Sequence, residues 1–460
     1  MAGYESKSYW LESVEDDLTP RPPLNGSREV DIAILGAGYT GLWTAYYLLK
    51  RDPSLNVAVV EKEIAGYGAS GRNGGWCSAG FPLSLSELER RYGRDAALLV
   101  HREMVDTVDE VGRVAQAEGI DCDFAKGGAL RLARGKHQLP TLERSMETYR
   151  HFGIEDHYTM LSKEEADERV QVSNVEGAIF TPDCAVIHPG KLVRGLARVV
   201  EKLGGVIYEQ TEVFRYEPGP NPVLYTNRGN LKAETIVIAG ESFLSQMDQF
   251  SRSLIPLYSL IVLTEPLEDA QWERIGWESR ECVSSSKYVV DYLSKTKDGR
   301  ILFGGRGAPY HFGSKIRDEY DHNERIHTML RESLLEWFPA VRLDQITHAW
   351  GGSLGMPRDW MPTMSYDPRT GVARAGGYTG QGVATANLSG RTLTDLITQE
   401  KSDLTLLPTV GHKSPQWEPE PLRYLGIRYI QEMYFRLDDK AAETGIPPDG
   451  STLAERLSRH

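Results

Sequence analysis

The stretch EVDIAILGAGYTGLWTAYYLLKRDPSLNVAVVEKE, residues 29–63, decides the fold. Its apolar run DIAIL (31–35) is typical of a buried parallel strand, GLWTAYYLLK (41–50) predicts a helix, and NVAVVE (56–61) predicts a second strand. Parallel strands need a crossover connection, so the stretch is a βαβ unit of about 30 residues. The sequence therefore predicts an α/β fold built outward from this unit.

The turn between the first strand and the helix carries the pattern Gly36-x-Gly38-x-x-Gly41. The first glycine allows the tight turn, the second lets backbone N–H groups approach a pyrophosphate, and the third lets helix and strand pack closely. The helix N-terminus adds partial positive charge. Glu61, 20 residues after Gly41, is placed to accept hydrogen bonds from ribose hydroxyls. Glu63 is the weaker candidate for this role, and a solvated surface charge is the alternative for both.

The next segment, GYGASGRNGG (66–75), bears on which dinucleotide is bound. Its small residues are unsuited to a hydrophobic core and are typical of a loop. Such a loop can lie against a planar ring and a diphosphate. Arg72 can offset phosphate charge, while Ser70 and Asn73 supply short hydrogen-bonding groups. The alternative is a flexible surface loop.

Six segments in one order now resemble a known family: GAGYTG, the acid Glu61, GASGRNGG, TIVIAG (235–240), DGRILFGGR (298–306) and GGYTGQGVATANLSG (376–390). Together they resemble the D-amino-acid oxidase-like flavoproteins, which include glycine oxidase, sarcosine oxidase and D-amino-acid dehydrogenase. GASGRNGG is similar to the branch that contains gamma-glutamylputrescine oxidase. The resemblance covers about residues 28–400, so the N-terminal arm and the last 60 residues lie outside it.

The resemblance implies FAD and an α/β fold, α+β overall, in which a Rossmann-like FAD-binding domain carries a second, antiparallel-sheet substrate domain. We expect an arm at 1–27, a discontinuous FAD-binding domain at 28–85, 180–245 and 345–400, a substrate domain at 86–179 and 246–344, and an extension at 401–460.

Several relatives attach flavin covalently through a cysteine before the last Gly-rich segment. The matching stretch, 352–368, has no cysteine, so noncovalent FAD is expected; Cys77, just behind the second loop, is the one candidate for a flavin link or contact.

The loops and the resemblance together imply a set of cofactor contacts, and the last Gly-rich loop would face the pyrimidine end of the flavin. A helix N-terminus there would stabilise the negative charge of reduced flavin, whereas the alternative is a simple capping turn. The expected contacts are Gly36, Gly38, Tyr39, Thr40, Gly41, Glu61, Lys62, Gly68, Ala69, Ser70, Arg72, Asn73, Gly74, Gly75, Val213, Ala239, Gly240, Gly352, Gly377, Tyr378, Thr379, Gly380, Gln381 and Gly382.

Candidates for the substrate pocket come from segments that resemble pocket segments of relatives. Arg306 could bind a substrate anion with two parallel hydrogen bonds, although a structural ion pair is equally open. Trp350 could wall the pocket and attract an ammonium group, with plain core as its alternative. Tyr258 is a third candidate, although it, Tyr288 and Tyr292 fit a core role better.

The segment LFGGRG has no lysine where some oxidases use one to help oxygen react, so the electron acceptor, oxygen or another carrier, stays open.

These features predict FAD-dependent oxidation of a carbon–nitrogen bond in a small amine or amino acid. A hydride passes to the flavin, and the imine then hydrolyses to a carbonyl product, so the protein supplies mainly alignment and desolvation. Oxidation of an alcohol or hydroxy acid is one alternative, and a flavin-binding interaction factor without turnover is another. A disulfide reductase would need a redox cysteine pair, which the sequence lacks.

The composition of the chain limits the kinds of molecule that it can bind. The net charge of −13 makes nucleic acid an unsuitable ligand, and no apolar run is long enough to span a membrane. The N-terminus is polar and acidic, so a cytoplasmic protein with a small-molecule substrate is expected; its oligomeric state stays open. No clustered Cys/His spacing suggests a metal, and free thiols are expected at the four separated cysteines, Cys77, Cys122, Cys184 and Cys282.

Overall fold

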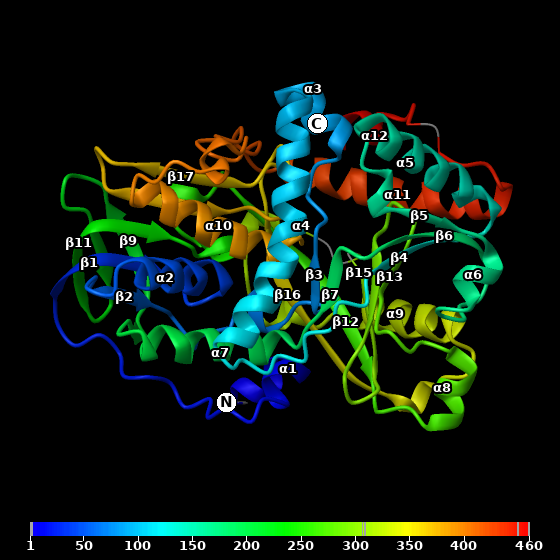
Figure 1. Cartoon of the computed structure of the whole chain (residues 1–460), viewed down its shortest axis with the longest axis horizontal. Helices are drawn as coiled ribbons and strands as arrows, with labels where there is room; N and C mark the ends of the chain where they lie inside the picture. The colour runs from blue at the N-terminus through cyan, green and yellow to red at the C-terminus, as the bar shows by residue number, and fades with distance from the viewer. Residues whose placement is uncertain (1–2, 306, 308–309, 449, 459–460) are drawn as a thin grey trace.

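Two eight-stranded sheets organise the protein (Figure 1). The computed structural model describes residues 3–305, 307, 310–448 and 450–458. One sheet is mostly parallel and Rossmann-like, and the other is mostly antiparallel. The predicted fold class, α/β with a second antiparallel-sheet domain, is therefore confirmed.

The first sheet grows from the βαβ unit that the sequence predicted. Its β1 runs parallel to both neighbours, with Ile32 beside Thr235 on one side and Val57 on the other. The middle of β1 is fully buried because packed elements cover both faces of the sheet. In order, the strands are β17 (Thr363–Asp367), β18 (Val372–Gly376), β11 (Gly229–Ile238), β1 (Arg28–Leu35), β2 (Val57–Val60) and β8 (Val206–Tyr208), with β10 (Val223–Thr226) and β9 (Val213–Glu217) branching from β11.

Helices cover one face of this sheet, and shorter elements cover the other. Ile34 and Val59 point into a core shared with the helices, whereas Ala33 and Ala58 point into a second core with Leu244 and its neighbours. This alternation follows from the two-residue period of a strand. The covering helices are α2 (Tyr39–Arg51), α4 (Arg94–Ala117), α7 (Pro189–Lys202) and α10 (Gly382–Ile397); the opposite face meets η5 (Glu241–Gln246) and η6 (Asp248–Phe250).

The second sheet also has two different faces. On β12, Tyr258 and Leu260 join a core with helix α9 (Glu324–Trp337), while Ser259 and Ile261 face the first sheet's side. Neighbouring strands are antiparallel except the pair β13 and β4. In order, the strands are β16 (Ile346–Met356), β12 (Ile255–Thr264), β15 (Ile301–Gly305), β14 (Asp291–Lys295), β13 (Cys282–Ser285), β4 (Ala129–Arg134), β6 (Val175–Thr181) and β5 (Thr159–Leu161).

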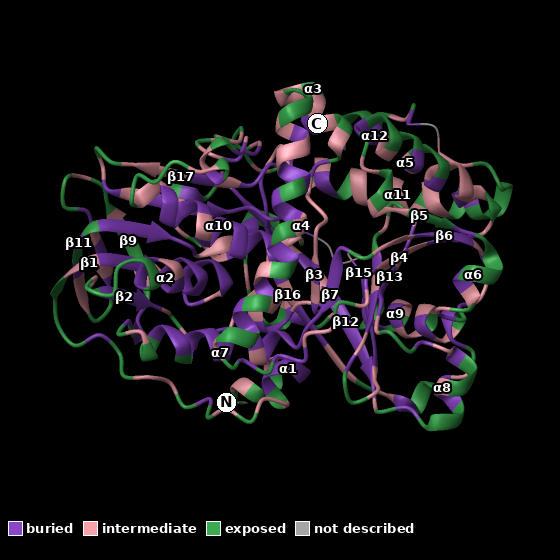
Figure 2. Ribbon diagram, in the orientation of Figure 1, coloured by how far each residue is buried: buried purple, intermediate pink, exposed green. Residues whose placement is uncertain are grey.

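The remaining elements connect or cover these sheets, and buried residues concentrate in the strands and inner helices (Figure 2). They are η1 (Tyr4–Lys7), α1 (Tyr9–Glu12), η2 (Ala69–Gly71), β3 (Trp76–Ser78), α3 (Leu85–Tyr92), η3 (Lys136–Gln138), α5 (Leu139–Phe152), η4 (Glu155–His157), α6 (Lys163–Asp167), β7 (Cys184–Val186), α8 (Asp269–Ile275), η7 (Phe312–Ser314), η8 (Asp318–Asp321), η9 (Leu343–Gln345), η10 (Asp403–Leu406), α11 (Leu422–Thr444) and α12 (Leu453–Ser458). Across the described residues, none of the helices has the length and apolar character to cross a bilayer.

The strands of the first sheet all fall inside the three segments expected for the FAD-binding domain. Two elements sit differently from the expected division. Strand β16 belongs to the third segment by number but pairs along its length with β12 of the second sheet. Helix α4, expected in the substrate domain, packs against α10 in the core of the first sheet. The domain limits accordingly stay a prediction.

Candidate functional site

A cavity of ≈790 Å³ lies between the two sheets. Its walls include the carboxyl ends of three parallel strands, at Leu35, Val60 and Ala239. Ligands of open α/β sheets bind outside these ends. From the second sheet the cavity is lined by residues of β12, β13, β14 and β16, including the expected contact Gly352, so both halves of the molecule contribute to it.

The first glycine-rich loop has the geometry that its spacing predicted. Gly36 has a φ of +102°, and a Cβ atom there would lie 2.7 Å from the Ala239 carbonyl oxygen. A Cβ on Gly41 would lie 2.0 Å from the Gly36 carbonyl oxygen, so this glycine lets α2 pack against the turn. Gly38 precedes the first residue of α2. Gly36, Gly38, Tyr39 and Thr40 line the cavity, whereas Gly41 does not.

Glu61 lines the cavity at the end of β2, and its carboxylate is held by backbone groups. One oxygen accepts a hydrogen bond from the Ala37 N–H and the other from the Glu63 N–H, each at 3.0 Å. Burial raises the pKa of the Glu61 carboxyl, and the two N–H groups oppose that rise. Beyond it, Lys62 forms an ion pair with Glu212 (2.8 Å), beside Val213 on the same part of the wall.

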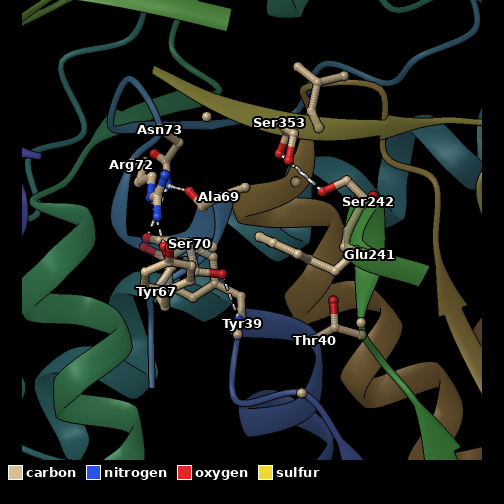
Figure 3. Close-up of a pocket in the computed structure, with 18 of the residues that line it drawn as sticks. Tyr39, Thr40, Tyr67, Ala69, Ser70, Arg72, Asn73, Glu241, Ser242 and Ser353 are labelled. Carbon is tan, nitrogen blue, oxygen red and sulfur yellow. Dashed lines mark hydrogen bonds between the residues drawn. The ribbon is translucent and has the colours of Figure 1, made fainter. Parts of the chain in front are cut away.

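The second glycine-rich loop stands on one side of the cavity, with Ser242 and Ser353 on the other (Figure 3). Ser70 Oγ accepts a hydrogen bond from the Tyr39 N–H at 2.9 Å, which joins the two loops. Asn73 donates to the Ala69 carbonyl (3.1 Å) and accepts from the Gly75 N–H (2.9 Å). The polar side chains of this loop therefore fix its shape.

Arg72 has a protein partner for its charge. Its Nη1 lies 2.6 Å from Asp321, and its Nε donates to the Tyr67 carbonyl at 2.7 Å. The side chain is almost fully buried. The sequence suggested a phosphate partner instead, but the ion pair ties the loop to η8 of the second domain.

Glu241 is a cavity residue that the sequence prediction missed. It follows Gly240 at the end of β11 with a φ of +46°. Its carboxylate accepts hydrogen bonds from the backbone N–H groups of Gly355 (2.6 Å), Gly377 (3.0 Å) and Tyr378 (3.3 Å). Burial raises the pKa of this carboxyl, and the N–H groups oppose the rise. One side chain thus connects three segments; its place directly after the Ala239-Gly240 turn was the available signal.

The last glycine-rich loop completes the cavity. Tyr378, Gly380, Gln381 and Gly382 line it, and α10 begins at Gly382. The Tyr378 hydroxyl lies 2.9 Å from Thr40 Oγ1, which links this loop to the first one. The expected contacts Gly75, Gly377 and Thr379 do not line the cavity; Gly377 instead donates its N–H to Glu241.

An aromatic wall lies on the second sheet's side of the cavity. It consists of Trp76, from the separate strand pair β3 and β7, together with Ser259, Ile261, Ser284, Val290 and Tyr292, and we call this set the second-sheet wall. A Cβ on Gly74 would lie 2.4 Å from Tyr292 Cε2, so this ring packs directly on the second loop. The Tyr292 hydroxyl lies 2.8 Å from Ser259 Oγ, and the Trp76 and Tyr292 rings meet edge to face at 6.5 Å. The strand pattern around Tyr292 favours a core role, and its place on the cavity corrects that prediction; Trp76 is a cavity residue that the sequence prediction missed.

Neither described candidate for the substrate pocket lines the cavity. Tyr258 belongs to the core beside α9, and its hydroxyl accepts from the Arg317 N–H at 3.3 Å. Trp350 is buried in a cluster with Trp10, and its indole N–H donates to the Arg72 carbonyl at 2.9 Å. Arg306, the third candidate, lies outside the described residues.

The four cysteines are buried free thiols. Cys77 is completely buried in the main core, and burial raises the pKa of its thiol far above the usual range. It does not line the cavity. The described part of the chain contains no group of three or more His, Cys, Asp or Glu side chains that could hold a metal ion.

Comparison with known proteins places this geometry among flavoenzymes. The family model described as "DAO: FAD dependent oxidoreductase" matches residues 31–396. The probable oxidoreductase OrdL of Rhizobium meliloti is 32% identical over 409 residues, covering 86% of this chain and 90% of the relative. The gamma-glutamylputrescine oxidoreductase of Escherichia coli is 28% identical over 394 residues, covering 85% and 89%. The crystal structure of glycine oxidase from Geobacillus kaustophilus shares the fold, with a TM-score of 0.70 at 23% identity over 84% of this chain and 99% of that one.

Proposed function

The chain belongs to the DAO family of FAD-dependent oxidoreductases, and on that basis we propose that it oxidises a carbon–nitrogen bond in a small amine or amino acid. FAD is its cofactor, and the family acts on amines or amino acids. The observation that carries the finer proposal is the second-sheet wall, which offers aromatic rings and hydroxyl groups opposite the glycine-rich loops.

The residues of this chain fit a long dinucleotide. At Gly36 and Gly74 a Cβ atom would collide with the Ala239 carbonyl and the Tyr292 ring, so both positions require glycine, and both line the cavity with backbone alone. Glu61 supplies carboxylate oxygens at the strand end where ribose hydroxyls bind in such folds. No cysteine lines the cavity among the described residues, which supports noncovalent attachment.

When bound, FAD would supply the acceptor for the hydride that leaves the substrate carbon and carries both electrons of the oxidation. The first turn of α10 begins at the cavity, at Gly382 and Val383. N–H groups in a first helical turn have no helical partners and carry partial positive charge, so they favour negative charge in the cavity. The contribution of this end of the site is electrostatic.

The second-sheet wall would hold the substrate. The aromatic rings of Trp76 and Tyr292 line the cavity, and such rings attract an ammonium group. The buried side chain of Ile261 gives this part of the wall an apolar surface, and desolvation against it disfavours the charged form of an amine. Loss of the ammonium proton frees the nitrogen lone pair that hydride departure requires. The imine product then hydrolyses in water to a carbonyl compound.

The test is anaerobic reduction of the purified, FAD-loaded protein by a substrate panel. The panel contains primary, secondary and N-alkyl amines, with and without a carboxylate, and a matched set of hydroxy acids and alcohols. We expect an amine or amino acid to bleach the visible flavin absorbance and to yield a carbonyl product. Bleaching by hydroxy acids alone, or by dithionite but by no panel member, would contradict the proposal. Admitting air afterwards distinguishes oxygen from another carrier as the electron acceptor.

A further inference from the structure

The N-terminal arm, residues 3–27, packs against the second glycine-rich loop of the cavity although the family model begins only at residue 31. The arm contains η1 and α1, and it runs beneath α7 before β1 starts (Figure 1). Ser8, Trp10 and Leu11 are almost fully buried, with exposed fractions of 3%, 2% and 1%. This part of the arm is therefore packed inside the molecule.

Three consecutive backbone carbonyls of the second glycine-rich loop are hydrogen-bonded by side chains from elsewhere. Ser8 Oγ donates to the Gly71 carbonyl at 2.7 Å. The Trp350 indole donates to the Arg72 carbonyl at 2.9 Å, and the Trp10 indole donates to the Asn73 carbonyl at 2.7 Å. The two indoles also meet edge to face at 6.2 Å. The loop is thus held by its carbonyl groups.

The N–H groups of the same three peptide units are less fully bonded than the carbonyl groups. In a trans peptide the N–H points away from the preceding carbonyl, so binding the oxygen orients both groups. The Arg72 N–H bonds to the Ala69 carbonyl. The N–H groups of Asn73 and Gly74 have no hydrogen-bond partner within the part of the chain that the structure describes. Both residues line the cavity.

We propose that Trp10 and Trp350 are positioning residues that hold two successive peptide groups with their N–H groups directed at FAD. Trp350 fixes the peptide between Arg72 and Asn73, and Trp10 fixes the peptide between Asn73 and Gly74. The free N–H groups then bind acceptor atoms of the flavin nucleotide, as successive backbone N–H groups do in anion-binding loops. Ser8 supports the preceding peptide, whose N–H is already used within the loop.

The arm is anchored on both sides, so its effect on the loop can be separated from its general packing. The Tyr9 hydroxyl donates to Asp298 of the second domain at 2.9 Å, and Lys7 pairs with Asp318 at 2.5 Å. Arg194 of α7 pairs with Asp16 at 2.8 Å. Tyr9 neighbours Trp10 in the same buried helix but bonds away from the loop. Tyr9→Phe is therefore a matched control for Trp10→Phe.

The experiment measures FAD affinity and stability separately on the full-length chain. Flavin-free wild type, Trp10→Phe and Tyr9→Phe are titrated with FAD by flavin fluorescence, and thermal unfolding of each flavin-free protein is recorded. A lost hydrogen bond lets the peptide turn, so only a fraction of the protein is competent to bind. We expect the FAD dissociation constant of Trp10→Phe to rise roughly two- to tenfold. We expect Tyr9→Phe to bind FAD as the wild type does.

Two further variants keep the test decisive if Trp10→Phe does not fold. Trp350→Phe removes the donor to the adjacent peptide and is expected to weaken FAD binding by a similar factor. Ser8→Ala is expected to have a smaller effect, because its peptide has no free N–H. Unchanged FAD affinity in the tryptophan variants, or equal weakening in Tyr9→Phe, would overturn the proposal. None of these measurements uses a substrate, so they are independent of the amine chemistry proposed above.

Discussion

Ser70 Oγ accepts a 2.9 Å hydrogen bond from the backbone N–H of Tyr39, and this bond couples the second glycine-rich loop to the start of α2. The contact lies beside Gly38, where a Cβ atom would come within 3.0 Å of the same hydroxyl oxygen. The first and second glycine-rich loops therefore share one crowded point. Substitutions there test the cofactor site directly.

Gly38→Val should purify folded but without yellow colour. A branched side chain displaces Ser70 and fills the place where the pyrophosphate approaches the backbone. The FAD content of the purified protein is measured by absorbance, and folding by circular dichroism. Gly219→Val, at a glycine with no neighbour within 4 Å, is the control and should keep its flavin. A folded, fully loaded Gly38→Val protein would refute the loop assignment.

Glu61→Gln should weaken FAD binding by roughly tenfold, because a charge-assisted hydrogen bond to the ribose becomes a neutral one. Fluorescence titration of the flavin-free protein gives the dissociation constant. Glu63→Gln is the matched comparison, since Glu63 also lines the cavity but accepts the Tyr4 hydroxyl at 3.0 Å. If the Glu63 variant loses more affinity than the Glu61 variant, the ribose role belongs to Glu63.

Tyr292→Phe should slow flavin reduction by the amine substrate, whereas Tyr258→Phe should leave it unchanged. Both tyrosines sit on strands of the second sheet, but only Tyr292 lines the cavity. Loss of its hydroxyl removes the contact with Ser259 that holds the ring in the wall, so the substrate is aligned less well against the flavin and the reduction rate should fall several-fold. Anaerobic stopped-flow absorbance measures the rate. Equal rates for both variants and the wild type would exclude the second-sheet wall as the substrate site.

Glu241→Gln should lower the free energy of unfolding by roughly 1–3 kcal/mol, because an amide NH₂ replaces one of two oxygens that accept backbone N–H groups. Denaturant unfolding of the FAD-loaded protein measures this loss. Glu212→Gln removes an exposed ion pair with Lys62 and should change stability little. A Glu241 variant as stable as the Glu212 variant would show that the three segments are held by other contacts.

His188 should make stability depend on pH in mildly acidic solution. Its Nδ1 accepts the Lys191 N–H, so the neutral ring carries its proton on Nε2, which faces Ser13 Oγ at 3.0 Å. Burial lowers its pKa from 6.5 to about 4. Between these values the unfolded chain binds the proton and the folded protein does not. The stabilisation is complete above about pH 6.5 and is lost as the pH falls toward 4, up to roughly 3 kcal/mol.

His188→Asn retains a helix-capping acceptor and does not titrate, so it isolates this contribution. Free energies of unfolding are compared at neutral pH and at points down to about pH 4. The wild type should lose more stability than the variant across this range. Parallel curves would mean that His188 titrates normally in the folded protein.

The first strands, the helix between them and the glycine-rich turn could be predicted from the sequence, because each depends on residues close together in the chain. The βαβ unit follows from apolar runs of the right length, and the three glycines of the first loop follow from steric limits within a few residues. Most of the expected cofactor residues do line the cavity, from Gly36 to Gly382. Their individual contacts with FAD remain predictions.

The substrate wall was not predictable in the same way. Side chains alternate between the two faces of a strand, so neighbouring residues of β12 and β14 must face opposite sides of the sheet. This alternation does not show which face meets the cavity. Tyr258 and Tyr292 both lie on strand-like segments, yet only Tyr292 lines the cavity, while Tyr258 belongs to the core beside α9. The choice between them depends on how the second sheet packs against α9 and the first sheet.

The sequence by itself determined a dinucleotide-binding start and a glycine-rich backbone near both ends of the chain, because short-range sterics and strand periodicity dictate those features. FAD as the expected cofactor came from the resemblance of its six ordered segments to the flavoprotein family. Only the tertiary structure decided the partners of the loop. Arg72 pairs with Asp321, and Trp350 bonds to the Arg72 carbonyl, across 249 and 278 residues of sequence respectively. Such contacts form where separate segments pack together, and no local pattern of residues encodes that proximity.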